Sequence, residues 1–250
     1  MNSVILPVAA QLSVSVKYLV FRTIGTSAMN FIGNTASRTA GHVLSRPGVI
    51  LLGIMLTLVA CALSGCGGSA PKLSKLPADA VVLAYGDSLT FGTGAQTEAS
   101  YPAVLEKLIG RKVWNAGVPG EVSAAGLARL PSALDYYQPR LLILCHGGND
   151  FLRKLGDAKA AENLRAIVRL AKQRGIDVVL IAVPKPGLFP SPPDFYAEIA
   201  KEFGLRYEDA ALKAILRDNE LKSDLAHPNA KGYAKLAEAI AALLKKSGAV

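Results

Sequence analysis

The chain has 250 residues, 51% of them apolar, and its mean hydropathy of +0.31 is high for a water-soluble protein. The formal charge at pH 7 is +9, yet the sequence holds no cluster of basic residues with interleaved aromatic residues, which argues against a nucleic-acid partner. Its three histidines and three cysteines lie at none of the spacings of a zinc site, so we expect neither a metal nor another cofactor.

The N-terminal part differs in composition from the remainder of the chain. The first acidic residue is Asp79, and only six lysines and arginines precede it. Residues 49–63 form an uncharged apolar run, preceded by Arg38 and Arg46. A run of 15 residues suits the apolar part of a signal peptide and is short for a membrane-spanning helix, which needs about 20. The sequence therefore predicts that 1–65 is a targeting segment.

This segment is followed by features of a lipoprotein. Leu63-Ser64-Gly65-Cys66 resembles a bacterial lipobox, which implies cleavage before Cys66 and a diacylglycerol on its thiol. Gly67 as the next residue implies transport to the outer membrane in a cell that has one. Residues 66–78 are thus interpreted as the lipidated cysteine and a flexible tether. We expect an exported protein on the periplasmic side of the cell envelope, with the membrane as a partner through its N-terminal lipid.

Two alternatives stay open in the leader. An uncleaved membrane anchor with an incidental cysteine would also place the rest of the chain outside the cytoplasm. Residues 1–45 are long for the start of a signal peptide. Either the true start lies downstream, at Met29 or a later alternative codon, or 4–21 form a second apolar membrane segment.

From Asp79 onward, short apolar runs alternate with longer helical patterns. A nearly continuous apolar run such as 178–183 implies a strand that is buried on both faces. The alternation predicts one α/β domain over 79–250, with a parallel five-stranded sheet between two layers of helices. The predicted strands are 80–85, 112–116, 140–145, 177–183 and 204–207. The predicted helices are 100–109, 123–136, 157–174, 194–203, 209–216 and 229–246, with Ser123 and Asp157 as N-caps and Gly175 and Gly204 as C-caps.

Three polar, glycine-rich turns follow the first three predicted strands. They are Gly86-Asp87-Ser88, Asn115 to Gly120, and Gly147-Gly148-Asn149-Asp150. Because the carboxyl ends of parallel strands share one edge of the sheet, we expect these turns to converge there. Cys145 ends the apolar third strand, and we expect it to be a buried, unreactive thiol.

Near the C-terminus comes Asp224-Leu225-Ala226-His227-Pro228. A serine at the end of a strand, together with an aspartate and a histidine, supplies the parts of a nucleophilic site. The serine attacks, the histidine takes its proton, and the aspartate holds the imidazole in the required tautomer.

With these motifs in place, the chain resembles the SGNH (GDSL) hydrolase family over essentially all of 79–246, and within it bacterial periplasmic thioesterase I/lysophospholipase and arylesterases. The resemblance implies a flavodoxin-like fold with Ser88 as the nucleophile, His227 as the general base and Asp224 as its partner. It also implies an oxyanion hole made by the Ser88 and Gly120 backbone N–H groups and the Asn149 amide, with Gly117 as the second choice for the glycine.

Other residues near these motifs receive structural interpretations. We expect Asp87 to brace the turn at the end of its strand and Asp150 to tie its own loop. His146 either lines an acyl pocket or is a satisfied histidine near the surface. The proline-stiffened stretch 184–193 either walls an acyl pocket with Leu188 and Phe189 or is a surface connector.

The resemblance implies a serine ester hydrolase that works through an acyl-enzyme on a small-molecule ester or thioester. Because no long lid segment is apparent, we expect an open site for short- to medium-chain acyl groups, aryl esters and thioesters included. The alternatives are an O-acetylesterase that acts on cell-wall or exported polysaccharide, a non-catalytic binding lipoprotein, and acyl transfer to an alcohol other than water.

Overall fold

A computed structural model of the protein describes residues 71–250. The predicted leader, 1–65, and the predicted lipidation site, Cys66, lie outside the described residues, as does the first part of the tether. None of the helices in 71–250 is both long enough and apolar enough to cross a bilayer.

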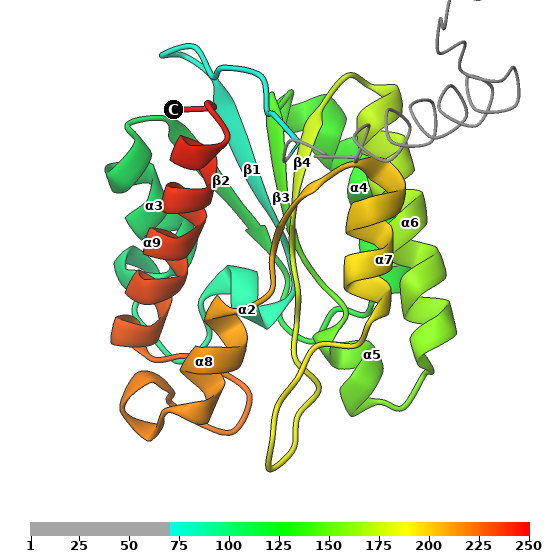
Figure 1. The fold of residues 1–250 in the computed structure, drawn as a ribbon, viewed down its shortest axis with the longest axis vertical. Helices are drawn as coiled ribbons and strands as arrows, with labels where there is room; N and C mark the ends of the chain where they lie inside the picture. The colour runs from blue at the N-terminus through cyan, green and yellow to red at the C-terminus, as the bar shows by residue number, and fades with distance from the viewer. Residues whose placement is uncertain (1–70) are drawn as a thin grey trace, which may run out of the picture. The chain divides into compact units, whose positions relative to one another are not determined.

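The centre of the domain is a parallel sheet of five strands in the order β2-β1-β3-β4-β5 (Figure 1). The strands are β1 (Val81–Gly86), β2 (Lys112–Gly117), β3 (Leu141–Cys145), β4 (Asp177–Ile181) and β5 (Arg206–Glu208). This is the strand order of flavodoxin-like folds. The prediction of a three-layer α/β domain with five parallel strands is confirmed, because helices cover both faces of this sheet.

The helices are distributed over the two faces, with α3 and α9 on one side and α4, α6 and α7 on the other (Figure 1). Their bounds are α2 (Ser88–Phe91), α3 (Tyr101–Ile109), α4 (Ser123–Tyr137), α5 (Gly148–Leu152), α6 (Asp157–Gln173), α7 (Phe195–Phe203), α8 (Ala211–Arg217) and α9 (Ala230–Lys246). Two short 3₁₀ turns occupy Thr97–Ala99 and Asn219–Leu221. All five residues of β3 are buried, as apolar central strands covered on both faces must be.

The register of the strands brings three turns to one level. Gly86, the last residue of β1, is paired with Gly117 of β2 on one side and with Cys145 of β3 on the other. All three strands therefore end together, and the polar turns that follow them share one edge of the sheet. Close approach across this edge requires glycine at position 86, where a Cβ would lie 1.9 Å from the Cys145 carbonyl oxygen.

Two predicted helix N-caps are wrong. The N-cap of α4 is Val122, and Ser123 is the first helical residue, because its hydroxyl and its N–H both bind the Asp150 carboxylate. The N-cap of α6 is Gly156, whose φ of 93° only glycine adopts readily, so Asp157 begins the helix. Gly204 is the C-cap of α7 as predicted, whereas α6 is capped by Arg174, with Gly175 one residue further on.

Candidate active site

The nucleophile candidate stands at the start of a one-turn helix directly after β1. Ser88 is the first residue of α2, and the Asp87 carboxylate caps this helix by accepting a hydrogen bond from the Leu89 N–H at 3.1 Å. This cap fixes the direction of the chain as it leaves the strand. Asp87 thus braces the turn, as predicted, and burial raises the pKa of its carboxyl although His146 and the Leu89 N–H act to lower it.

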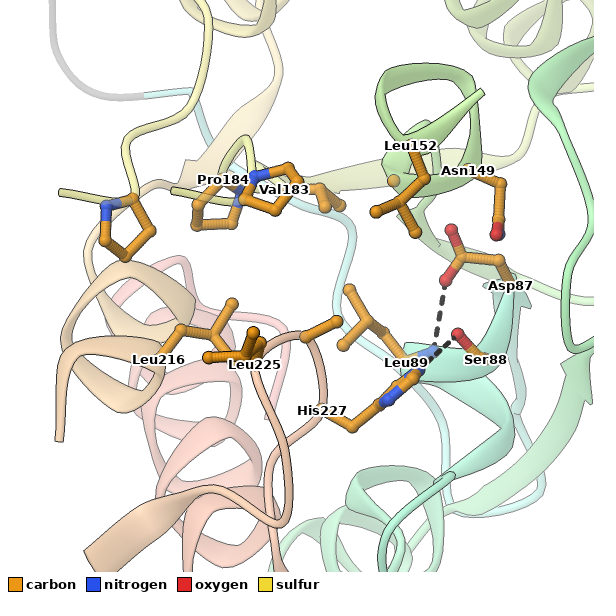
Figure 2. A pocket seen from close by; sticks show the side chains of 14 residues that line it. Asp87, Ser88, Leu89, Asn149, Leu152, Val183, Pro184, Leu216, Leu225 and His227 are labelled. Carbon is orange, nitrogen blue, oxygen red and sulfur yellow. Dashed lines mark hydrogen bonds between the residues drawn. The ribbon is translucent and has the colours of Figure 1, made fainter. Parts of the chain in front are cut away.

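The hydroxyl and the imidazole meet at hydrogen-bond distance. Ser88 Oγ lies 2.9 Å from His227 Nε2, although 139 residues separate them in sequence (Figure 2). On the other side of the ring, His227 Nδ1 lies 2.8 Å from Asp224 Oδ2. Because a carboxylate only accepts, Nδ1 carries the proton, and the Nε2 lone pair faces the serine hydroxyl. This is the tautomer that a general base needs.

Asp224 is held in place by its own turn. Its Oδ1 accepts hydrogen bonds from the backbone N–H groups of Ala226, at 2.7 Å, and His227, at 2.9 Å. Partial burial would raise the pKa of the Asp224 carboxyl, but these N–H groups and the His227 ring together lower it below its ordinary value. The carboxylate is therefore ionised wherever the imidazole has to be oriented.

The second turn, which follows β2, contains Gly120, the predicted oxyanion-hole glycine. Gly120 has a φ of 76°, and its carbonyl oxygen accepts from Arg153 at 2.7 Å. The Asn149 side-chain amide donates one of its two N–H groups to the Glu121 carbonyl oxygen at 3.0 Å, which fixes the orientation of the amide. Gly117 is a packing glycine instead, because its N–H already donates to Asn115 and a Cβ there would lie 2.1 Å from the Phe91 nitrogen.

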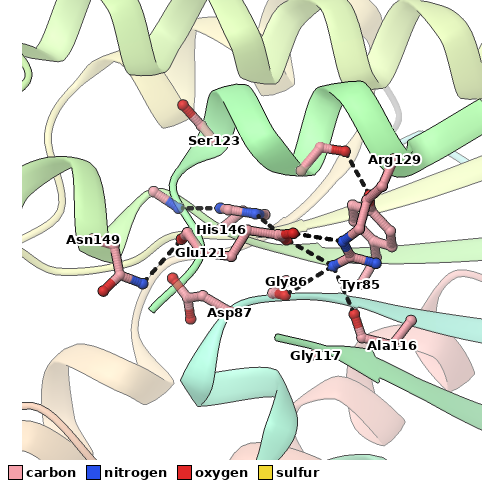
Figure 3. Close-up of polar contacts among 12 residues, drawn as sticks. Tyr85, Gly86, Asp87, Ala116, Gly117, Glu121, Ser123, Arg129, His146 and Asn149 are labelled. Atoms are coloured by element: carbon pink, nitrogen blue, oxygen red, sulfur yellow. Dashed lines mark hydrogen bonds and ion pairs between the residues drawn. The ribbon is translucent and has the colours of Figure 1, made fainter. Parts of the chain in front are cut away.

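A partly buried charged cluster supports this turn (Figure 3). Glu121 accepts two hydrogen bonds from Arg129, each of 2.7 Å, and one from His146 Nε2 at 3.1 Å. Arg129 also donates to the Gly86 and Ala116 carbonyl oxygens, so it joins the ends of β1 and β2. Burial alone would raise the pKa of Glu121, but the hydrogen bonds from His146 and Arg129 and the Arg129 charge lower it to about 2.

The position of His146 agrees with neither of the two interpretations made from the sequence. Its side chain is wholly buried, away from both the surface and the pocket beside Ser88. Nδ1 accepts from the Gly147 N–H at 3.0 Å, so Nε2 carries the proton that is donated to Glu121. The ring fits against Gly126, where a Cβ would come within 2.4 Å of Nε2. His146 is therefore a satisfied histidine of the interior.

Sequence reasoning assigned no role to Glu121 and Arg129. Their sequence signal is an acid directly after Gly120 and an arginine eight residues further on, which is too common a pattern to indicate an ion pair. Asp150 does tie its loop as predicted, since it binds Ser123. Within residues 71–250, no group of three or more histidine, cysteine or acidic side chains is placed to hold a metal ion.

The pocket beside Ser88 is small and opens into a groove. The space next to Ser88, Asn149 and His227 is about 40 Å³. Residues Pro186, Pro190, Leu216 and Leu225 line both this pocket and a wider groove of about 680 Å³. Leu188 and Phe189 also line the groove, so the loop after β4 walls the space that leads away from the serine.

An oriented serine–histidine–aspartate set on the edge of a parallel α/β sheet is the site of a serine hydrolase. Comparisons with known proteins narrow this class. The profile of the GDSL-like Lipase/Acylhydrolase family matches residues 84–235, and the chain belongs to this family. It is a serine ester hydrolase.

Individual relatives agree with the family. Esterase TesA of Pseudomonas aeruginosa is 34% identical over 132 residues, which make up 51% of this chain and 65% of that esterase. "Thioesterase 1/protease 1/lysophospholipase L1" of Escherichia coli K12 is 31% identical over 156 residues, 59% of this chain and 75% of that protein. A crystal structure of TesA has a TM-score of 0.61 and 27% identity and covers 67% of this chain and 99% of its own. These relatives do not favour the alternative of a polysaccharide O-acetylesterase.

Proposed function

We propose that this protein cleaves short- to medium-chain acyl esters, including aryl esters and thioesters, through an acyl-enzyme on Ser88. The observation that carries this proposal is the 2.9 Å approach of Ser88 Oγ to His227 Nε2, with Asp224 on the opposite side of the ring. The relatives named esterase and thioesterase support the same chemistry.

In the first half of the reaction, Ser88 Oγ attacks the carbonyl carbon while its proton passes to His227 Nε2. The imidazolium that forms lies against the Asp224 carboxylate, which stabilises the charge. The carbonyl oxygen becomes an oxyanion that accepts from the Ser88 and Gly120 N–H groups and the free N–H of Asn149. When the tetrahedral intermediate collapses, His227 returns the proton to the leaving alkoxide or thiolate.

In the second half, a water takes the place of the leaving group. His227 removes a proton from this water, the hydroxide attacks the acyl-enzyme carbonyl, and the proton finally returns to Ser88 Oγ as the acid leaves. The small space beside Ser88 favours a slim acyl chain, and the groove beyond it, walled by Leu188 and Phe189, offers apolar surface to a longer one.

The test is a panel of p-nitrophenyl esters from acetate to dodecanoate and an acyl thioester, together with a fluorophosphonate probe. We expect turnover of the shorter esters and covalent labelling, both abolished in Ser88→Ala. Ser132→Ala removes an exposed hydroxyl on α4 and is the matched control, which keeps both. A Ser88→Ala protein that still turns over ester and accepts the probe would refute the assignment. An unlabelled wild-type protein would favour a binding lipoprotein.

We further propose that the domain is exported and anchored to the membrane through a lipid on Cys66. The apolar run 49–63 and the lipobox-like Leu63 to Cys66 support this proposal. Globomycin treatment and Cys66→Ser should each block maturation and lipid attachment and so change mobility on a gel. Unchanged mobility in both cases contradicts lipidation.

A further inference from the structure

The described chain begins beside the end of the last helix. The Leu73 N–H donates to the Ser247 carbonyl oxygen at 3.4 Å, and the Leu76 N–H donates to the Ala249 carbonyl oxygen at 2.8 Å. These bonds hold the entry segment, residues 71–76, along the C-terminal end of α9. Cationic side chains of both segments therefore lie together on one face of the domain.

The face is hollowed by a pocket of about 570 Å³ whose lining includes five cations and no carboxylate side chain. The cations are Lys72, Lys75, Arg206, Lys245 and Lys246, which we call the cationic face. All four lysines are exposed. Lysines at the end of α9 stabilise its helix dipole, but that effect does not account for the other three cations.

Arg206 is the most informative member of the cationic face. Arg206 is only 8% exposed, and its Nε is buried without a hydrogen-bond partner. Within residues 71–250, Arg206 forms no ion pair. A largely buried guanidinium whose Nε has no hydrogen-bond partner is unfavourable, so an anion from outside the described chain is the expected counter-charge.

Two acids on neighbouring segments of the described chain accept hydrogen bonds from the backbone and form no ion pair with the cationic face. Glu208, in an adjoining hollow, accepts from the Ala210 and Ala211 N–H groups, and Asp177 accepts from the Ser74 N–H. The charge of the cationic face is therefore available to an external phosphate.

The cationic face lies at the sheet edge opposite the active site. Arg206 is the first residue of β5, whereas Ser88 follows the last residue of β1, and all five strands are parallel. In sequence, Pro71 at the rim of the pocket is five residues from Cys66.

We propose that the cationic face docks the domain on a membrane surface by binding the phosphate groups of anionic phospholipids. The mouth of the active site then faces the aqueous side, so substrate reaches Ser88 from solution. The guanidinium of Arg206 is a planar fork that can bind a phosphate bidentately, and the four lysines are compact point charges. This proposal does not depend on the proposed ester hydrolysis.

The test uses a soluble fragment, 71–250, which lacks Cys66 and any lipid. A fragment of this extent is expected to fold alone, because 67% of this chain matches 99% of the TesA chain, a complete domain. Co-sedimentation is measured with vesicles of phosphatidylglycerol and phosphatidylcholine, and with phosphatidylcholine alone. We expect binding only to the anionic vesicles, weakened by added salt because the charges lie at the surface.

Two sets of four substitutions distinguish the effect of the cationic face from the effect of the net charge of the domain. Replacing Lys72, Lys75, Lys245 and Lys246 with Gln should lower the vesicle partition coefficient by at least about 100-fold, since each lysine near an anionic surface strengthens binding several-fold. The control replaces Lys159, Lys213, Lys231 and Lys235 with Gln, which removes the same charge elsewhere and should have a much smaller effect. Equal losses in both sets overturn the proposal.

Arg206→Met provides a second measurement. Removing an unpaired buried charge should raise the melting temperature without lipid and weaken binding to anionic vesicles. A lower melting temperature together with unchanged vesicle binding contradicts the role of Arg206. If inorganic phosphate stabilises the fragment through Arg206 but anionic vesicles do not bind, the site is one for a free anion and membrane docking is overturned. Hydrolysis of a soluble ester should be equal in every variant, so a failure of docking is distinct from a failure of the proposed catalysis.

Discussion

At the scale of single residues, hydrogen bonds from neighbouring groups orient the proposed oxyanion donors. One N–H of Asn149 is bound to the Glu121 carbonyl oxygen, and this leaves the other N–H for an oxyanion. The Gly120 carbonyl is bound by Arg153, which sets the orientation of that peptide. Preorganised donors of this kind cost no rearrangement when charge develops, which is why they contribute much to the rate.

Asn149→Ala should keep the fold and lower kcat by about 10²–10³. The physical reason is the loss of one donor to the oxyanion, while the Ser88–His227–Asp224 contacts are untouched. The measurement is the steady-state rate with p-nitrophenyl butyrate, with circular dichroism to verify the fold. A rate within a factor of two of the wild-type value would remove Asn149 from the oxyanion hole.

Glu121→Gln should make the stability of the domain less dependent on acid pH. The folded-state pKa of Glu121 is about 2, below its ordinary value of 4.5. Its ionised form therefore stabilises the fold above about pH 4.5, and this contribution is lost as the pH falls toward 2. At pH 7 the substitution should cost about 2–3 kcal/mol, because Arg129 loses its charged partner.

The free energy of unfolding of both proteins, measured in urea at several pH values, checks this expectation. The difference between wild type and Glu121→Gln should be constant near neutral pH and shrink on acidification. A difference that stays the same down to pH 3 would show that the carboxylate is not held by Arg129 and His146 in this way.

At the scale of elements, long periodic segments were predictable and short ones were not. The predicted strands and the six longer helices agree with the structure because each carries a clear pattern of apolar residues. The helices α2 and α5 have only four and five residues, too few for a helical period, and were missed. Both begin at the ends of strands, where Ser88 and Asn149 are located.

The candidate triad could be found from sequence because Ser88, Asp224 and His227 lie in recognisable motifs. The supporting cluster of Glu121, Arg129 and His146 could not be found from sequence. Glu121, Arg129 and His146 come from a turn, a helix and the end of a strand, and only the folded chain brings them together. The interpretation of His146 failed for this reason, since burial beside an acid cannot be read from one position.

Gly117→Ala should destabilise the domain by about 1–3 kcal/mol, the usual cost of overpacking. The added Cβ would collide with backbone atoms of Phe91 and so push α2 away from β2. Gly187→Ala is the matched control, because a Cβ at Gly187 meets nothing within 4 Å. Urea unfolding of the two variants measures the effect. Equal stabilities would show that α2 tolerates displacement from β2.

At the scale of the whole molecule, the parallel sheet separates the candidate active site from the cationic face. The carboxyl ends of the strands carry the turns of the candidate active site, because the register of β1, β2 and β3 ends these strands at one level. The opposite edge carries Arg206 and the segment through which the chain enters the domain. Loops at one edge can thus change without altering the other, since the buried strands lie between them.

Reaction of Cys145 with a thiol reagent can report the opening of this sheet. The thiol is buried at the end of β3, and burial raises its pKa well above the ordinary value. It is the sole cysteine of a 71–250 fragment. A thiol reagent can therefore react only when the central strands separate. Its rate of incorporation thus reports how often the whole molecule opens. Labelling much faster than urea-measured unfolding predicts would reveal a partial opening that exposes the middle of the sheet.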